Sequence, residues 1–239
     1  MLAQYTPAET LMLVESEKTT LRLLLLLTFL DLRLKKVLEV AWLHQPTGKK
    51  GETAWGPYVQ YGEMFLDYEP KPHENVFYEP LASCTEPVMP LGRLLEEARE
   101  LAVSRMDYLE NYFLKDAAFA KNFIAIGINI PLSAAGKREG KRLSDEIRLL
   151  NEQAPGVMND SPQEAAEILL TVGGNMFLLN SVPYEKMEAF GEVIGRDRSL
   201  KYADNEWRFD KQKKANPFYD LQKISTLFYK EFEHPQSAA

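Results

Sequence analysis

Cysteine is almost absent from this sequence, since Cys84 is the only one among 239 residues. A single cysteine excludes an internal disulfide, so packing and polar contacts must hold the fold together. The three histidines, His44, His73 and His234, show none of the close spacings that are typical of a zinc site. The sequence therefore predicts neither a metal site nor a bound cofactor.

Catalytic motifs are also lacking, including the G-x-S-x-G nucleophile elbow of α/β-hydrolases. The sequence AGKREGKR at 135–142 approaches a phosphate-binding loop, but only three residues separate Gly136 from Gly140 and Arg142 replaces the hydroxyl residue that would hold Mg²⁺. We therefore favour a non-catalytic protein. An enzyme stays open as the alternative, because active sites can assemble from scattered residues.

No hydrophobic run is long enough to cross a membrane, which takes about 20 apolar residues. The most apolar stretch, LRLLLLLTFLDLRLKKVLEV at 21–40, contains Arg22, Asp31 and Arg33. Each charge near mid-bilayer would cost about 2.5–3.5 kcal/mol. The acidic start of the chain is also unlike a signal peptide. We expect a cytoplasmic protein in which this stretch forms a buried helix at the centre of a domain.

The composition is that of a globular protein, with 45% hydrophobic and 26% charged residues. The formal net charge is −7. An acidic chain gains no general attraction to nucleic acid, although a local basic patch can still bind it. The composition therefore favours a protein partner over a nucleic acid.

Apolar spacing and capping residues predict an α-rich α+β fold. Thr6 to Glu9 has the pattern of a capping box, and Ser161 to Glu164 has a second one. The expected helices are 7–15, 17–35, 91–114, 138–153, 162–180, 183–194 and 216–232, and the expected strands are 37–44 and 58–68. Five prolines between 69 and 92 predict irregular structure there. We expect a winged-helix-like part at 1–68 with one β-hairpin, a linker or surface loop at 69–90, and a helical bundle at 91–239.

The segment TTLRLLLLLTFLDLRLKKVLEVAW, residues 19–42, resembles the helix-to-strand unit of winged-helix domains. It is also similar to the corresponding unit of Golgi-phosphoprotein-type domains, which are helical lipid-binding proteins. The position that is often glycine in this unit is Lys36 here. The resemblance covers about a fifth of the chain and implies a fold, but fold alone does not imply function.

Aromatic residues gather in the region of the expected hairpin. Trp42, Trp55, Tyr58 and Tyr61 suit a ligand or partner surface, because aromatic side chains dominate such sites. The alternative is that they simply cover the sheet. Trp207 lies in a second candidate region, since segment 196–230 holds nine Lys or Arg against five Asp or Glu.

Basic residues suggest two places for an anion or a nucleic acid. Arg33 and Lys36 end the long helix, and Lys49 and Lys50 lie at the hairpin tip, where a wing would contact phosphates. Cations at a helix end and in a solvated loop explain the same pattern. The second place is the expected helix start at Lys137 and Arg138, although this pattern is more typical of a solvated basic turn.

These patterns predict a non-catalytic cytoplasmic binding or regulatory protein that acts through protein or anionic-ligand contacts. Two alternatives remain. One is an enzyme with a pocket between the β-hairpin and the helices. The other is a DNA-binding regulator that uses the basic hairpin tip.

Overall fold

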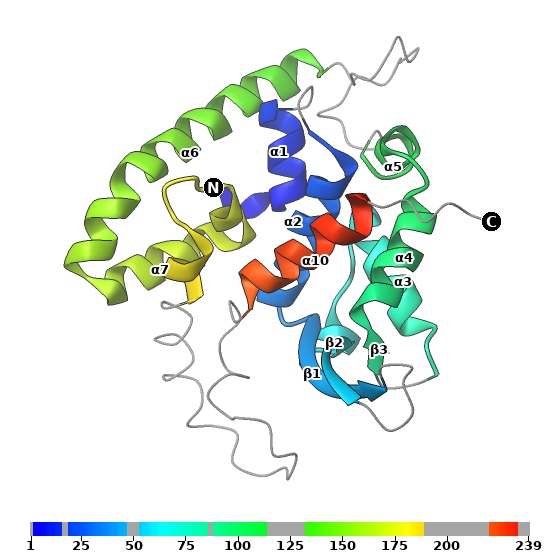
Figure 1. Ribbon diagram of the computed structural model, residues 1–239. Helices are drawn as coiled ribbons and strands as arrows, with labels where there is room; N and C mark the ends of the chain where they lie inside the picture. The colour runs from blue at the N-terminus through cyan, green and yellow to red at the C-terminus, as the bar shows by residue number, and fades with distance from the viewer. Residues whose placement is uncertain are drawn as a thin grey trace. The chain divides into compact units, whose positions relative to one another are not determined.

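The computed structural model describes residues 2–15, 19–46, 53–85, 88–113, 132–188 and 220–233. Over these residues the chain is mostly helical, with a small antiparallel sheet of three strands (Figure 1). The α-rich α+β class is therefore confirmed. Contacts divide the chain into unit 1, with Met1–Thr19 and Ala117–Thr226, and unit 2, with Thr20–Asp116 and Leu227–Ala239. Each unit thus combines segments that are distant in the sequence.

The leucine-rich stretch forms α2, Leu21–Leu34, at the centre of unit 2. Thr20 caps its start by accepting a hydrogen bond from Leu23 N at 3.2 Å. Every residue from 24 to 33 is buried, so the helix is covered on all sides. Phe29 packs against Phe77, at 5.5 Å between ring centroids, and against Phe228, at 5.3 Å. Among the described helices, none is long and apolar enough to cross a membrane.

The end of α2 is a Schellman motif built on a lysine. Lys36 has a φ of 58°, in the left-handed region that favours glycine. Lys36 N donates to Arg33 O, and Val37 N donates to Leu32 O, both at 2.9 Å. The conformation that glycine often supplies in the helix-to-strand unit is thus adopted here by Lys36.

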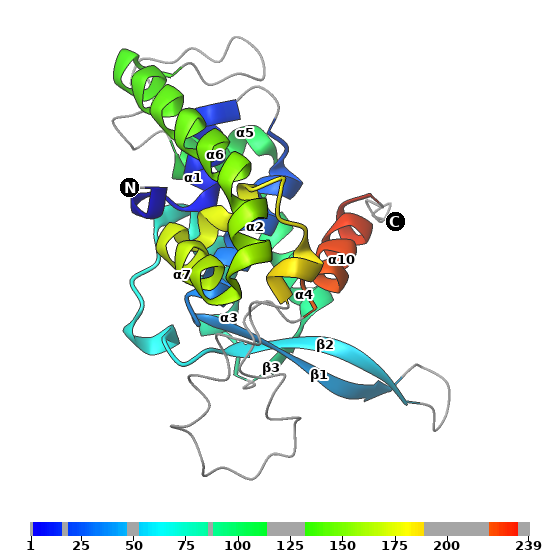
Figure 2. The same ribbon diagram turned by 90° about the vertical axis from the view of Figure 1, so that its left-hand side faces the viewer.

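The sheet has the order β1-β2-β3, with β1 at Leu38–Pro46, β2 at Thr53–Tyr61 and β3 at Val88–Pro90. In the hairpin, Ala41 faces Tyr58, and β3 pairs only with residues 58–60 of β2. Figure 2 shows the hairpin extending past the short β3. The first strand was predicted correctly. The second was not, because β2 begins five residues before the predicted start and ends at Tyr61, just before Gly62.

Residues 69–90 are more regular than their prolines suggest. They contain the 3₁₀ turn η3, Pro72–Glu74, the helix α3, Asn75–Ala82, and β3. Val76, Phe77 and Leu81 of α3 are buried, so this segment belongs to the core of unit 2 rather than forming an irregular linker. Pro72 occupies the first position of η3, where a missing N–H costs little.

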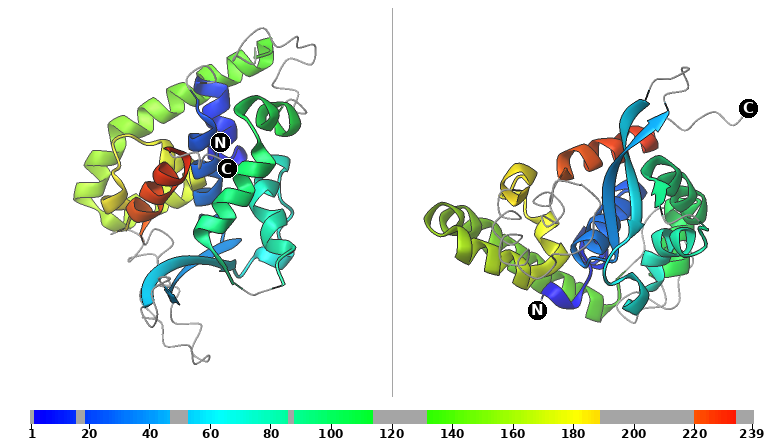
Figure 3. Two further views of the ribbon diagram at one scale, coloured as in Figure 1. Left: turned by 45° about the vertical axis from the view of Figure 1, so that its right-hand side comes forward. Right: turned by 90° about the horizontal axis from the view of Figure 1, so that it is seen from below.

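The predicted helix at 91–114 is two helices, α4, Leu91–Ala102, and α5, Arg105–Tyr112. Ser104 begins α5 by accepting a hydrogen bond from Asp107 N at 3.2 Å. This cap competes with continuation of α4, which explains the break. The helices α3 and α4 lie side by side (Figure 3).

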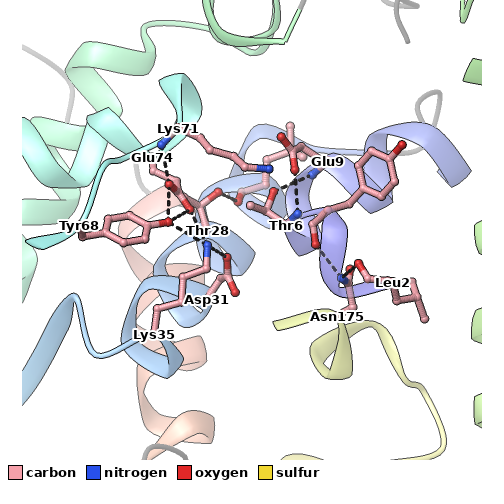
Figure 4. A network of polar contacts seen from close by, with 12 residues as sticks. Leu2, Thr6, Glu9, Thr28, Asp31, Lys35, Tyr68, Lys71, Glu74 and Asn175 are labelled. Atoms are coloured by element: carbon pink, nitrogen blue, oxygen red, sulfur yellow. Dashed lines mark hydrogen bonds and ion pairs between the residues drawn. The ribbon is translucent and has the colours of Figure 1, made fainter. Parts of the chain in front are cut away.

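Unit 1 contains η1, Leu2–Gln4, α1, Pro7–Glu15, α6, Ala134–Asp160, α7, Pro162–Val172, and η4, Gly173–Leu178. The predicted capping box of α1 is confirmed, since Thr6 N donates to Glu9 Oε2 at 2.7 Å and Glu9 N donates to Thr6 Oγ1 at 3.2 Å. Asn175 Nδ2 donates to Leu2 O and Tyr5 O, both at 2.8 Å, which ties η4 to the start of the chain (Figure 4). The predicted helix at 162–180 breaks at Gly173, which has a φ of 60°.

Gly140 allows α6 to pack closely on α1. A Cβ atom at this position would lie 2.2 Å from Leu13 O, whereas Gly156 in the same helix is exposed and has no atom within 4 Å of such a Cβ. We expect Gly140→Ala to lower the free energy of unfolding by about 2–3 kcal/mol, because the backbones must separate. Gly156→Ala should raise it by up to about 1 kcal/mol through helix propensity. Urea unfolding followed by circular dichroism compares the two, and equal effects would contradict the close approach.

Candidate interaction surface

A buried network of charges joins the end of α2 to the segment around η3. Lys35 Nζ lies 2.7 Å from Asp31 Oδ2 and 2.9 Å from Glu74 Oε1 (Figure 4). It also donates to the Tyr68 hydroxyl at 2.9 Å, and this hydroxyl donates to Glu74 Oε2 at 2.8 Å. Lys71 N donates to the same carboxylate oxygen at 2.7 Å. The network therefore fixes residues 68–74 against the helix.

The network contains two carboxylates and one ammonium group. The side chains of Asp31 and Glu74 are 3% and 0% exposed, whereas that of Lys35 is 32% exposed. Burial raises the pKa of Asp31 to about 6, against the opposing effect of Lys35. Burial opposes ionisation of Glu74 as well, but the Lys35 ammonium and the Lys71 N–H bring the pKa of that carboxyl below its usual value. Burial also disfavours the charged form of Lys35, yet the two carboxylates outweigh it and raise its pKa.

Asp31→Asn should remove a dependence of stability on pH. The folded-state pKa of Asp31 lies above its ordinary value of 3.8, so its stabilising contribution is present at low pH and is lost as pH rises through about 6. As pH rises from 4.5 to 7.5, the free energy of unfolding of Asp31→Asn should therefore increase by about 2 kcal/mol relative to that of the original protein. Urea unfolding at the two pH values measures this. A difference that does not change with pH, or that changes in the opposite direction, would contradict the raised pKa.

Just after β2, the chain packs directly against the end of α2. Gly62 N donates to Val37 O and Met64 N donates to Lys36 O, both at 2.9 Å. A Cβ atom on Gly62 would lie 2.1 Å from Lys36 O, so only glycine fits this approach. Gly62 therefore lies outside β2, which ends at Tyr61. It begins a tight turn over residues 62–69, which we call the β2 turn.

Phe65 anchors the β2 turn in the core of unit 2. It lies in the 3₁₀ segment η2, Phe65–Asp67, and is 3% exposed. Its ring is stacked between Tyr61 and Tyr78, with centroid distances of 4.0 and 4.4 Å. The Tyr78 hydroxyl donates to Phe65 O at 3.1 Å, and Tyr61 donates to Leu81 O at 3.0 Å. Both faces of the ring and its backbone carbonyl are thus fixed.

The anchored turn displays apolar side chains to solvent. Leu66 is 85% exposed, Met64 is 41% exposed and the adjoining Tyr61 is 37% exposed. These three exposed side chains lie within six consecutive positions of the chain and form a candidate contact surface. Asp67 and Glu69 of the same turn are also exposed. Of these residues only Tyr61 was a candidate from the sequence.

The hairpin carries a second exposed aromatic group. Trp55 is 58% exposed, and its ring lies 4.0 Å from that of His44 on the neighbouring strand. Trp42 and Tyr58 are half-buried, as expected for residues that cover a sheet. Trp207 lies outside the described residues. The proposed aromatic surface is therefore divided between Trp55 and Tyr61, with Trp42 and Tyr58 less accessible.

The predicted basic contacts that the structure describes are distributed over both units. Arg33 is only 8% exposed, because α2 is covered on all sides, so it does not lie on an accessible basic surface. Lys36 Nζ pairs with Glu63 Oε2 at 2.5 Å. Lys137 and Arg138 are exposed near the start of α6 in unit 1, whereas Lys36 belongs to unit 2. Lys49 and Lys50 lie outside the described part of the chain.

A small apolar hollow lies between α6 and α7 in unit 1. It carries no ionisable group and is lined by Leu150, Gln153, Ala154, Val157, Met158, Ala165, Ile168, Leu169 and Leu179. The enzyme alternative places a pocket with ionisable groups between the hairpin and the helices, and this hollow does not match that description. Across the residues that the structure describes, no three His, Cys, Asp or Glu side chains gather as metal ligands.

No protein-family model, no curated protein and no solved structure matches the chain.

Proposed function

We propose that this chain is a non-catalytic binding protein of the cytoplasm whose partner is another protein. The contact surface is formed in unit 2 by the β2 turn, with Leu66 at its centre, and by Trp55 on the hairpin. The observation that carries the proposal is the 85% exposure of Leu66 on a turn whose anchor, Phe65, is buried. An exposed leucine on a preformed turn can be buried by a partner with little loss of conformational entropy.

The enzyme alternative has less support. The network around Lys35 has the shifted pKa values that are common in active sites. However, Asp31 and Glu74 have almost no exposed side-chain surface, so a substrate could not reach them. The network is better explained as a set of structural contacts that hold residues 68–74 against α2.

The DNA-binding alternative depends on the winged-helix resemblance. In that arrangement Lys36, Lys49 and Lys50 would contact phosphates together. Within the described residues only Lys36 could contribute, and it is already paired with Glu63. The winged-helix arrangement therefore remains a prediction, and a protein partner remains the better proposal.

A photo-reactive benzoylphenylalanine at position 64 or at position 55 tests the proposal in cells of the native host. Both sites are exposed, and positions 101 and 149, at 40% and 47% exposure, provide matched controls on α4 and α6. We expect covalent adducts with another protein from position 64 or 55 and not from the controls. Adducts from none of the sites, or equally from all four, would contradict the proposal.

A further inference from the structure

We propose that the partner of the β2 turn presents a pocket for one leucine side chain, surrounded by lysine and arginine residues. This inference deepens the proposed function and rests on it. It assigns Leu66 as the residue that enters the pocket, and Asp67 and Glu69 as the residues that face the basic rim.

The charges on the turn are the first part of the argument. Glu63 is balanced by Lys36, whose ammonium lies 2.5 Å away. Asp67 and Glu69 are exposed and form no ion pair with any other described residue. The positive charge of the nearby Lys71 favours the ionised form of the buried Asp31. The solvent-facing side of the turn is therefore acidic next to Leu66.

This acidity distinguishes between possible occupants. An anionic membrane surface would repel Asp67 and Glu69, although Leu66 and Met64 could enter lipid. A second copy that docked turn to turn would bring the same acidic groups face to face, which is also unfavourable. A protein surface with an apolar pocket and a basic rim would accommodate Leu66 and attract Asp67 and Glu69. Its positive potential would also raise the rate of association.

The rigidity of the turn is the second part of the argument. Phe65, stacked between Tyr61 and Tyr78, holds the backbone on the inner side of Leu66. Residues at the centre of protein interfaces that enter a pocket contribute most when they are fixed before binding. Leu66 meets this condition, and its acidic neighbours would form the polar rim.

The test uses the full chain with benzoylphenylalanine at position 64, so that Leu66 is unchanged. We expect the adduct to map to a partner segment with more Lys and Arg than Asp and Glu. The double variant Asp67→Asn and Glu69→Gln should lower the yield about tenfold, and Leu66→Ser should do the same. All three substitutions are at exposed side chains, so a melting temperature equal to that of the original chain shows that folding is intact.

Several results would overturn the inference. An adduct on a neutral or acidic segment, on lipid or on a second copy would each do so, as would a yield that the double variant leaves unchanged. The adducts formed at position 55 distinguish failure of this inference from failure of the proposed function. Protein adducts at 55 or 64 without a basic contact segment overturn the inference alone, whereas no adducts at either position overturn both.

Discussion

Replacing Lys35 with methionine should lower the free energy of unfolding by about 3–5 kcal/mol at pH 7. The change removes the ammonium group that lies within 2.9 Å of both Asp31 and Glu74 and leaves these buried carboxylates without their cation. Methionine nearly matches the length of the lysine stem, so the lost charge, and not lost packing, causes the effect. Urea unfolding followed by circular dichroism measures it.

The neighbouring lysine provides the control. Lys36 also forms an ion pair, but its side chain and that of Glu63 are 41% and 47% exposed. Exposed pairs contribute about 0–1 kcal/mol, so Lys36→Met should have a small effect. The cost of Lys35→Met should also decrease at pH 4, where protonation of Asp31 and Glu74 removes the unpaired charges. Equal effects of the two substitutions would show that the network around Lys35 does not stabilise the fold.

Gly62→Ala should destabilise the protein by about 3 kcal/mol and displace the β2 turn. The added Cβ would lie 2.1 Å from Lys36 O and 2.6 Å from Lys36 C, and backbone atoms cannot move aside as a flexible side chain could. The two hydrogen bonds that Gly62 N and Met64 N donate across this approach would be lost with it. Unfolding in urea gives the stability.

Gly92 is the matched position for this substitution. It is exposed in the first turn of α4, and no atom lies within 4 Å of a Cβ placed there. Gly92→Ala should leave the stability unchanged or raise it by up to about 1 kcal/mol. If Gly62→Ala were as mild as Gly92→Ala, the close approach between the β2 turn and the end of α2 would be refuted.

Local patterns predicted those elements whose signals are strong within a few residues. The run of leucines at 23–27 identified α2 as a buried helix, and the capping box at Thr6 identified the start of α1. Where two local signals compete, the prediction failed. Apolar spacing continues across Val103, yet the cap at Ser104 divides the region into α4 and α5. The prolines near 72 and 80 suggested irregular structure, but burial of Phe77 stabilises a helix there.

The candidate surface was harder to predict than the fold. Leu66 lies in a stretch whose alternation suggested a strand, and its exposure depends on Phe65 being the residue that enters the core. That choice follows from the stacking partner Tyr78, thirteen residues away, which no local pattern identifies. Arg33 shows the opposite case. It resembled a cation at a helix end, but tertiary packing around α2 buries it.

The central claim is that the β2 turn is fixed before any partner binds. Amide hydrogen exchange of the purified chain, resolved at Gly62, Met64, Phe65 and Asp67, tests it most directly. Each of these N–H groups donates to a backbone carbonyl, on Val37, Lys36, Gly62 and Met64 respectively. We predict exchange at least about a hundredfold slower than in an unstructured peptide. Exchange at the rate of an unstructured peptide would mean that the turn is not preformed and would contradict the account.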